Sequence, residues 1–409
     1  MARIAAGRVE SQMTQQSAAT QSWRGVSERV IPFVFFSFAC YLTIGVQLAI
    51  LPSFVHLTLG FSTVLAGLII SAEYVATVVT RPFAGWVIDR LGAKKSVEYG
   101  LILCGTSGVL TLLATFGVRW PWAGLGLLVA GRLILGASES LVGTGASIWG
   151  IMSVGTEHTA TVISWNGIST YGALAIGAPV GVYLENLLGF WAIGATVMLL
   201  GFGTIGLAMR KAAVPVVHGE KLPFHHVLGK VAPYGIALAL GSVGFGVLAT
   251  FITLDFAHRH WQGAAFALTL FGACFILARL VFAWAINQLG GFRVALACFA
   301  VEAVGLTTLW LAHTVAGCFA GAALTGFGFS LVFPALGVEA VRPVAPQDKG
   351  SALGAFGVFM DFALMAVGPG AGAIISGFGY PPIYLFAAVS VLTALGLTGV
   401  LALRAHRVG

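Results

Sequence analysis

Charged side chains are scarce in this sequence: Asp, Glu, Lys and Arg together make up only 9% of its 409 residues. Soluble globular domains carry roughly 25% charged residues, so the composition excludes an ordinary water-soluble fold. Hydrophobic residues account for 58% of the chain, and the mean hydropathy is +0.96. The 55 glycines are spread through the apolar runs, which is typical of membrane helices that pack closely through small residues.

Cysteine is too rare, with five residues that all fall in apolar stretches, to build a disulfide framework. The histidines are not accompanied by a cluster of cysteines or carboxylates, so we expect neither a metal site nor a cofactor. No nucleophile with a neighbouring base is apparent either, which argues against an enzyme. Residues 1–26 lack the short apolar core of a signal peptide, and the first apolar run, Ile31 to Val55, is long enough to span a membrane.

Twelve apolar runs reach the length of about 20 residues that a helix needs to cross a bilayer. Six lie within residues 27–209 and six within 231–403, with a charged central loop at 210–230 between them. Residues 1–26 and 404–409 form polar tails. We therefore predict an all-α membrane protein of two six-helix bundles. The expected spans are 29–51, 62–86, 97–117, 122–150, 159–182, 188–209, 231–255, 262–287, 293–313, 315–337, 350–377 and 381–403.

The basic residues indicate which side of the membrane each loop faces. If the N-terminus is inside, sixteen of the 21 Lys and Arg residues lie in inner tails and loops, whereas the outer loops hold only Arg119 and Arg259. Cytoplasmic loops of membrane proteins carry such an excess. We expect both termini in the cytoplasm of a bacterial cell with the chain in the inner membrane. The net charge of +7 is then explained by topology, and nucleic acid is not expected as a partner.

The two halves contain an internal repeat. A shift of 198 positions aligns Arg81–Lys95 with Arg279–Arg293, and five of the fifteen positions are identical. A shift of 190 repeats five residues of Gly131–Val142 in the second half and also places Pro179 over Pro369. Two parallel six-helix repeats are a transporter architecture, in which the substrate site lies between the halves near the membrane midplane.

A loop motif follows the second span. The stretch GWVIDRLGAKK, from Gly85 to Lys95, combines spaced glycines with an Asp-Arg pair and a basic pair, and it resembles the signature between helices 2 and 3 of the major facilitator superfamily. Gly85 predicts the close approach of a neighbouring helix. Asp89 is placed to complement the positive N-terminus of a facing helix. Asp89 and Arg90 are therefore candidates for a coupling or gating role. The remaining motif residues are Gly92, which belongs to the turn, and Arg90, Lys94 and Lys95, which are expected at the anionic inner leaflet.

Two further stretches resemble the drug/proton-antiporter branch of that superfamily. GRLILGASES, which contains Arg132 and Gly136, is similar to its helix 4 pattern, and GALAIGAPVG, which contains Gly177 and Pro179, is similar to its helix 5 pattern. The stretches YLTIG, SWNGISTYGA and FSLVFPALGVEAV resemble the YhhS-type group of bacterial transporters. The resemblance implies a monomeric secondary transporter that moves a small molecule by alternating access.

Charged residues inside the spans are the strongest pointers to a site, because they are costly in lipid and usually pair or line a cavity. At about 1.5 Å per residue, Glu73, Arg132 and Asp361 each lie about 15–16 Å from the helix end used for counting. We predict that these three form a midplane set for coupling or gating, in which a carboxylate carries a proton. Arg81 and its repeat counterpart Arg279 are expected at the inner gate or in contact with lipid headgroups.

Four residues are candidates for the substrate cavity: Trp165, Asn166, Tyr171 and Glu139. Packing against neighbouring helices is the alternative for the first three, and structural pairing is the alternative for Glu139. The sequence offers no account of Glu302, which lies in the middle of the ninth span.

Proton-coupled efflux of a small organic solute is the leading prediction. The alternatives are a proton/solute symporter for uptake and, from a different class, a sensor or scaffold on the same fold. The sequence does not identify the substrate.

Overall fold

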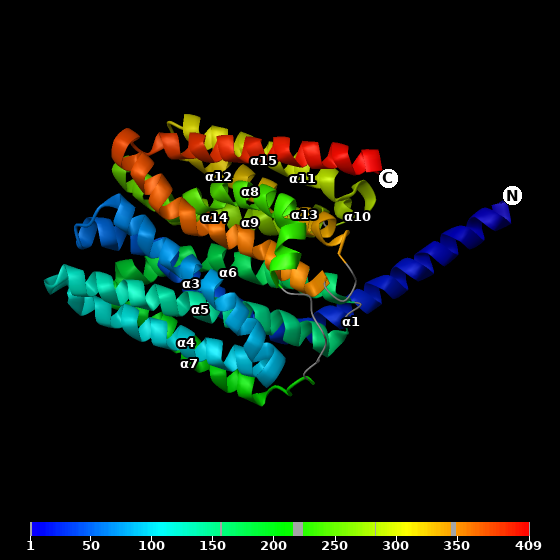
Figure 1. Ribbon diagram of the computed structural model, residues 1–409, viewed down its shortest axis with the longest axis horizontal. Helices are drawn as coiled ribbons and strands as arrows, with labels where there is room; N and C mark the ends of the chain where they lie inside the picture. Colours follow the sequence, from blue (N-terminus) through cyan, green and yellow to red (C-terminus); the bar gives the residue numbers. More distant parts are fainter. Residues whose placement is uncertain (1, 156–157, 216–223, 283, 345–348, 409) are drawn as a thin grey trace.

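The computed structural model describes residues 2–155, 158–215, 224–282, 284–344 and 349–408. Twelve helical segments within these ranges are long and apolar enough to cross a membrane, which confirms the predicted number. The helices run side by side along the long axis of the molecule, and both termini lie at the same end (Figure 1). The N-terminal part of the first helix projects away from the bundle (Figure 1). Helices account for all the regular secondary structure in the described part, so the all-α prediction is confirmed.

The first half supplies six long helices. They are α1 (Ala2–Leu48), α3 (Thr63–Leu91), α4 (Ala93–Ala114), α5 (Pro121–Val154), α6 (Thr159–Leu188) and α7 (Trp191–Arg210). The short helix α2 (Leu51–Ser53) prolongs the first span.

The second half repeats this plan. Its helices are α8 (Phe224–His258), α9 (Ala264–Phe282), α10 (Ala285–Leu289), α11 (Gly291–Leu311), α12 (Val315–Phe329), α13 (Val332–Val341), α14 (Lys349–Phe378) and α15 (Pro381–Val408). Helices α12 and α13 form one span that is interrupted at Ser330. Pro334 explains the interruption, because proline has no N–H to donate to the carbonyl of Ser330 four residues earlier.

Glycines let the helices meet backbone to backbone. Gly67 of α3 lies against Gly368 of α14, and these two helices join the halves. Gly177 of α6 lies against Gly45 of α1, so the glycine-proline stretch around Pro179 is a packing face in this structure. Small residues are the usual means of close helix contact in membranes, where hydrophobic attraction between helices is weak.

The repeat is visible in the packing as well. Gly136 of α5 leaves room for the backbone carbonyl of Glu73 on α3. In the second half, Gly326 of α12 leaves room for the backbone carbonyl of Phe271 on α9. These two contacts are related by the same shifts, 190 for the glycines and 198 for the carbonyls, that align the sequence. The two halves therefore share a helix-packing arrangement, while the side chains on it differ.

The loop motif lies where α3 passes into α4. Gly92 has a φ of +91°, which favours glycine, and its N–H donates to the carbonyl of Ile88. The Lys94 ammonium donates to the carbonyls of Met209 and Lys211, both at 2.8 Å, and so binds the negative C-terminal end of α7. The Lys95 ammonium lies 2.7 Å from the Glu98 carboxylate, one turn further along α4.

The close approach predicted at Gly85 does not occur in this conformation. A Cβ atom added to Gly85 would meet open space, because α3 is not covered by a neighbour at this point near its end. Asp89 is exposed in the last turns of the same helix, and its contact with a facing helix remains a prediction. The Arg90 guanidinium lies 5.5 Å from the ring centre of Trp86.

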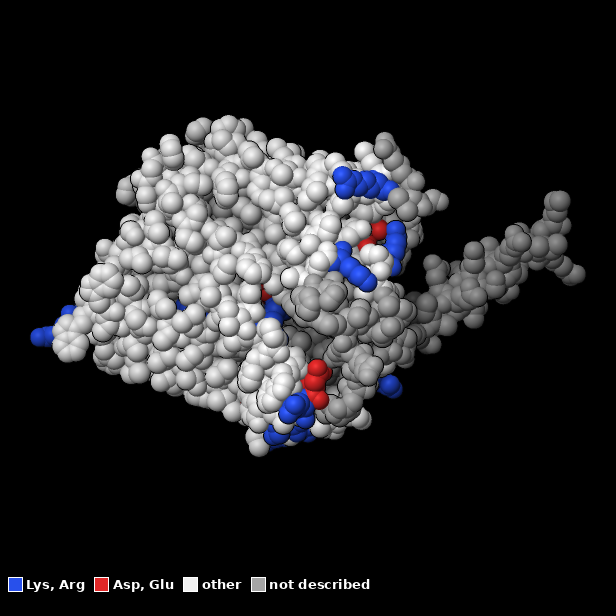
Figure 2. Space-filling view, viewed as in Figure 1, with Lys and Arg blue, Asp and Glu red and all other residues white. Residues whose placement is uncertain are grey.

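Basic side chains gather toward one end of the molecule. Most of the Lys and Arg side chains in view lie toward the end at which Figure 1 shows the C-terminus (Figure 2). We refer to this end, which also carries the turn at Gly92, as the inner end. The opposite end is the outer end.

Candidate functional site

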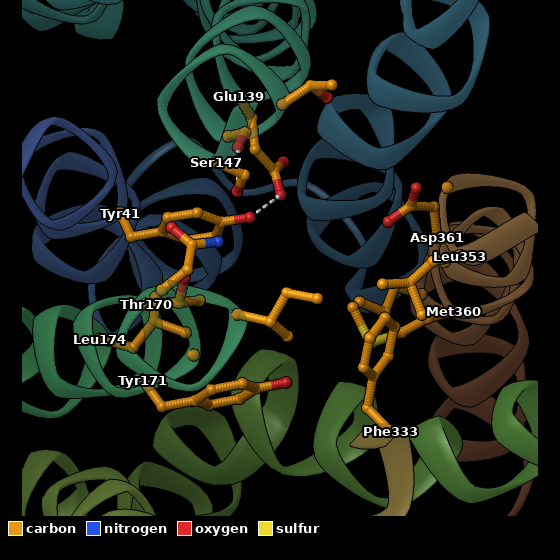
Figure 3. A pocket seen from close by; sticks show the side chains of 18 of the residues that line it. Tyr41, Glu139, Ser147, Thr170, Tyr171, Leu174, Phe333, Leu353, Met360 and Asp361 are labelled. Carbon is orange, nitrogen blue, oxygen red and sulfur yellow. Dashed lines mark hydrogen bonds between the residues drawn. The ribbon is translucent and has the colours of Figure 1, made fainter. Parts of the chain in front are cut away.

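A cavity of about 320 Å³ lies between the two halves. Ligand pockets for small organic molecules typically have volumes of about 300–1,000 Å³, so this cavity has room for a small solute. Helices α1, α3, α5 and α6 of the first half line it, together with α8, α9, α12, α13 and α14 of the second (Figure 3). Both halves therefore contribute to one site, as the repeat predicts.

The cavity extends toward the inner end. Its lining includes Ser147 and Ile151 near the end of α5, Thr159 at the start of α6 and Leu353 near the start of α14. The halves are in contact nearer the outer end, through the Gly67 and Gly368 backbones and through other contacts. Two of these are the hydroxyls of Thr63 and Ser376 at 3.2 Å and the Thr269 hydroxyl with the Ala175 carbonyl at 3.0 Å.

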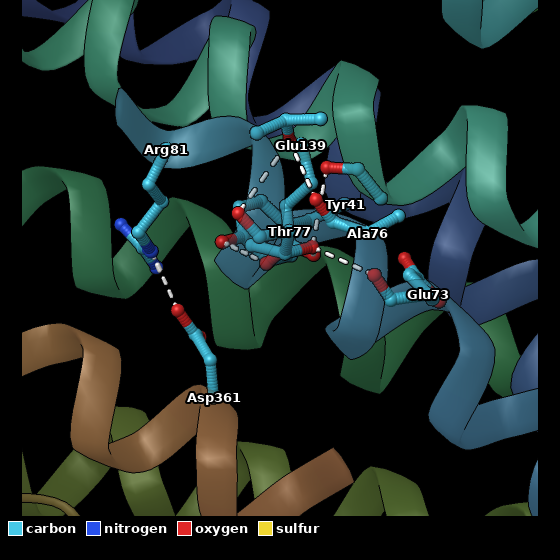
Figure 4. A network of polar contacts seen from close by, with 9 residues as sticks. Tyr41, Glu73, Ala76, Thr77, Arg81, Glu139 and Asp361 are labelled. Carbon is cyan, nitrogen blue, oxygen red and sulfur yellow. Dashed lines mark hydrogen bonds and ion pairs between the residues drawn. The ribbon is translucent and has the colours of Figure 1, made fainter. Parts of the chain in front are cut away.

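The first-half wall is polar at Glu139. The Tyr41 hydroxyl donates to one carboxylate oxygen of Glu139 at 2.8 Å, and the Thr77 hydroxyl donates to the other at 3.0 Å (Figures 3 and 4). These residues come from α1, α3 and α5, so the carboxylate is held by three helices. Glu139 lines the cavity and is also tied to neighbouring helices by these hydrogen bonds, so its position fits both the cavity interpretation and the structural pairing named as the alternative.

An ion pair joins the two halves across the cavity. The Arg81 Nε atom on α3 lies 2.5 Å from the Asp361 Oδ2 atom on α14 (Figure 4). Both side chains line the cavity, and the Asp361 side chain is only 2% exposed.

Asp361 was expected beside Glu73 and Arg132, and that part of the prediction is wrong. The depths of Glu73 and Arg132 were counted from the outer end, whereas that of Asp361 was counted from the inner end. Counted from the inner end, Arg81 is about 15 Å from Leu91 and Asp361 is about 18 Å from Lys349. On that scale the two residues differ in depth by only about 3 Å, so Asp361 lies with Arg81.

The predicted proximity of Glu73 and Arg132 is confirmed, because their side chains form an ion pair. The pair joins α3 to α5 within the first half, and its members are 0% and 1% exposed. Neither side chain belongs to the lining of the cavity. A solute or a water molecule in the cavity therefore does not reach Glu73 in this conformation.

The three candidates on α6 occupy different positions. Asn166 and Tyr171 line the cavity, and the buried Oδ1 atom of Asn166 has no hydrogen-bond partner within the described structure. The Trp165 indole points elsewhere and donates to the Ser27 hydroxyl of α1 at 3.0 Å. Trp165 packs in a cluster with Val30 and Val34, so packing, the alternative named for it, describes its position.

Aromatic rings from both halves line another part of the cavity. Tyr171 of α6 stacks on Phe275 of α9 with ring centres 3.7 Å apart. Phe245 lies close to the Tyr171 ring, and Phe329 lies close to both rings. The sequence did not single out these phenylalanines, because isolated aromatic residues in an apolar span show no pattern that separates a cavity wall from helix packing. The internal repeat gives one indication that was available in the sequence. Phe329 aligns with the cavity candidate Glu139 under the shift of 190.

Glu302 of α11 lies away from the cavity. Its carboxylate is fully buried close to Gly244 of α8, its backbone lies against Gly328 of α12, and no hydrogen-bond partner is recorded for it among the described residues. Across the same residues, no group of three His, Cys, Asp or Glu side chains is arranged to hold a metal ion.

Comparison with known protein families agrees with this arrangement of two six-helix halves around a cavity. The sequence model of the Major Facilitator Superfamily matches residues 33–254. The chain belongs to the Major Facilitator Superfamily. It is 54% identical over 379 residues to an uncharacterized MFS-type transporter of Burkholderia mallei, covering 93% of each chain. It is 52% identical over 394 residues to an uncharacterized MFS-type transporter of Pseudomonas aeruginosa, covering 96% of this chain and 97% of the relative.

Solved structures of MFS-type transporters share the fold. The nucleoside transporter NupG superposes with a TM-score of 0.72 at 17% identity, covering 91% of this chain and 99% of that one. The human organic anion transporter MFSD10 superposes with a TM-score of 0.71 at 15% identity and the same coverage. Identities this low establish the fold alone. Together with the close relatives, they identify this chain as a multi-pass membrane transporter of the MFS type and not an enzyme.

Proposed function

We propose that this MFS transporter exports a small organic solute in exchange for protons and that the cavity carboxylates Glu139 and Asp361 carry the coupling. The observation that supports this proposal most directly is their position. Both line the cavity between the halves, and both are nearly buried, at 6% and 1% exposure. Coupling requires a titratable group that the cavity brings into contact with water from alternating sides.

Asp361 connects protonation to the arrangement of the halves. Burial away from water favours a neutral carboxyl, and a neighbouring guanidinium favours a charged one. When Asp361 gains a proton, its attraction to Arg81 weakens, and this pair spans the contact between α3 and α14. A proton therefore shifts the equilibrium between states in which these helices are held together and states in which they separate.

Glu73 and Arg132 have a different role in this proposal. Their pair is outside the cavity and fixes α3 against α5, so it keeps the first half rigid while the halves move. We assign them a positioning role and not a proton-carrying one. The export direction is favoured by the resemblance of the Gly177 and Pro179 stretch to the drug/proton-antiporter branch.

The test uses everted vesicles with an acidic interior and three probes with one ring system: 1-naphthoate, 1-naphthylmethylamine and 1-naphthalenemethanol. Proton-coupled export predicts that at least one probe accumulates inside to a higher level than in matched vesicles without the protein, and that collapse of the pH gradient by nigericin abolishes this difference. Accumulation only in right-side-out vesicles with an acidic exterior would contradict export and indicate uptake. A gradient without effect on any probe contradicts proton coupling.

Matched variants locate the coupling. Asp361→Asn and Glu139→Gln are expected to lose accumulation against a gradient while exchange down a gradient survives. Glu28→Gln is the control, because Glu28 is exposed on α1 outside the cavity lining. If both cavity variants accumulate probe as the wild-type protein does, the carboxylates do not carry the proton.

A further inference from the structure

The two halves place an arginine at equivalent positions of the cavity. Arg81 on α3 and Arg279 on α9 are related by the shift of 198, and both line the cavity. The helices that they face are equivalent as well, because α14 aligns with α6 under the shift of 190 that relates Pro369 to Pro179. The residue across from each arginine is therefore open to direct comparison.

The comparison shows that Arg81 has a carboxylate opposite it and that Arg279 does not. Arg81 pairs with Asp361 of α14. The counterpart of Asp361 on α6 is Tyr171, a residue that carries no charge when protonated. Within the described part of the chain, Arg279 makes no ion pair with an acidic side chain. The cavity thus contains one neutralised arginine and one arginine without a counter-ion.

Local contacts hold the Arg279 side chain but leave its charge uncompensated. Its Nη2 atom donates to the Ser330 carbonyl at 2.8 Å, the carbonyl that Pro334 leaves free of a helical hydrogen bond. Its guanidinium carbon lies 4.9 Å from the ring centre of Phe275, and the absence of a side chain at Gly167 makes room for it. The residue is 7% exposed, and its buried Nε atom has no hydrogen-bond partner.

A buried guanidinium in this state calls for an anion. Arginine remains charged at all physiological pH values, and its planar fork matches the geometry of a carboxylate. A charge at membrane depth is costly unless it is paired. The stacked rings of Tyr171 and Phe275 lie beside it and offer a flat apolar surface to the rest of a ligand.

We propose that the solute is an organic monoanion with a flat apolar body, whose carboxylate binds Arg279 and whose body lies against Tyr171 and Phe275. This inference rests on the proposed transport function and specifies its substrate class. A single negative charge is specified because Arg81, the other cavity arginine, is already neutralised by Asp361. The substrate carboxylate pairs with Arg279 in the same way as the Asp361 carboxylate pairs with Arg81.

Binding to the purified full-length protein in nanodiscs tests the proposal, with 1-naphthoate against its cationic and neutral counterparts 1-naphthylmethylamine and 1-naphthalenemethanol. We expect naphthoate to bind at least tenfold more tightly than either counterpart. Arg279→Gln should weaken naphthoate binding by at least tenfold, as expected for the loss of a charge-assisted hydrogen bond. Equal affinities for the three probes, or naphthoate binding that Arg279→Gln leaves unchanged, would overturn it.

A second pair of variants keeps the test decisive if Arg279→Gln does not fold. Tyr171→Asp supplies the missing carboxylate from the position equivalent to Asp361, so it should form a pair with Arg279 and abolish naphthoate binding. Tyr171→Asn is the matched control, since it removes the same ring without adding a charge and should bind more naphthoate than Tyr171→Asp. Indistinguishable binding by these two variants overturns the proposal.

Failure here is separable from failure of proton coupling. Export of 1-naphthylmethylamine under a pH gradient, with naphthoate ignored, overturns the anion site and leaves coupled export standing. Naphthoate binding that depends on Arg279, with transport insensitive to the pH gradient, supports the anion site and overturns the coupling.

Discussion

The ion pair of Glu73 and Arg132 provides a quantitative test of how the two halves differ. Arg132→Ala removes the guanidinium and leaves the Glu73 carboxylate at 0% exposure without its partner. Removing one partner of a buried pair typically destabilises a protein by about 3–5 kcal/mol. We therefore expect the single variant to unfold well before the wild-type protein.

The internal repeat supplies the compensating change. The counterparts of Glu73 and Arg132 in the second half are Phe271 and Ala322, so the same helix contact is made there without charge. Replacing a buried ion pair by well-packed apolar residues is often neutral or stabilising. The double variant Glu73→Phe with Arg132→Ala should recover most of the loss, in spite of carrying one more substitution.

Unfolding of the purified protein in mixed micelles, followed by tryptophan fluorescence as the share of denaturing detergent rises, measures this order. The expected order of stability places the double variant close to the wild-type protein and Arg132→Ala far below it. A double variant as unstable as the single one would refute the reasoning, because it would show that the first half needs these charges for its packing. Coupled transport by the double variant is also expected, since the pair is outside the cavity.

Three further predictions concern topology, gating and the loop motif. Reporter fusions after Lys230 and at the C-terminus should both report the cytoplasm, and a periplasmic signal at either site contradicts the assigned orientation. Gly368→Leu should force α14 away from Gly67 of α3, so a Ser376→Cys background should react several-fold faster with an impermeant maleimide; unchanged labelling means that this contact does not keep the outer end closed. Lys94→Met should lower stability by about 0.3–1 kcal/mol through loss of the charge at the C-terminal end of α7; thermal unfolding checks this, with an unchanged midpoint as the contrary result.

Hydropathy, glycine content and the repeat were sufficient to predict the helical fold, because each is a local property of the sequence. The partners of the intramembrane charges were predicted only in part. Depth along a helix is one coordinate, and it brought Glu73 and Arg132 together correctly. It did not identify Arg81 as the partner of Asp361, because that contact depends on how the two halves dock and on the helix end from which depth is counted.

Helix rotation limited the remaining predictions. Asn166 and Trp165 are neighbours in the sequence, but one lines the cavity and the other donates to Ser27 of α1. Nothing local in the sequence separates these two orientations. The sequence also could not predict that Arg279 lacks an acidic partner, although the repeat identified Arg279 as the counterpart of Arg81. That prediction requires the residue opposite each arginine, which only the structure identifies.

The backbone contact of Gly67 with Gly368 has an electrical consequence. It leaves no room for a chain of water molecules between α3 and α14 near the outer end. When water fills the cavity from the inner side, most of the transmembrane voltage falls across this thin closed layer. Each elementary charge that crosses the layer then exchanges about 2.3 kcal/mol per 100 mV with the field. Together with the other contacts between the halves at the outer end, this glycine pair concentrates the field just beyond the cavity.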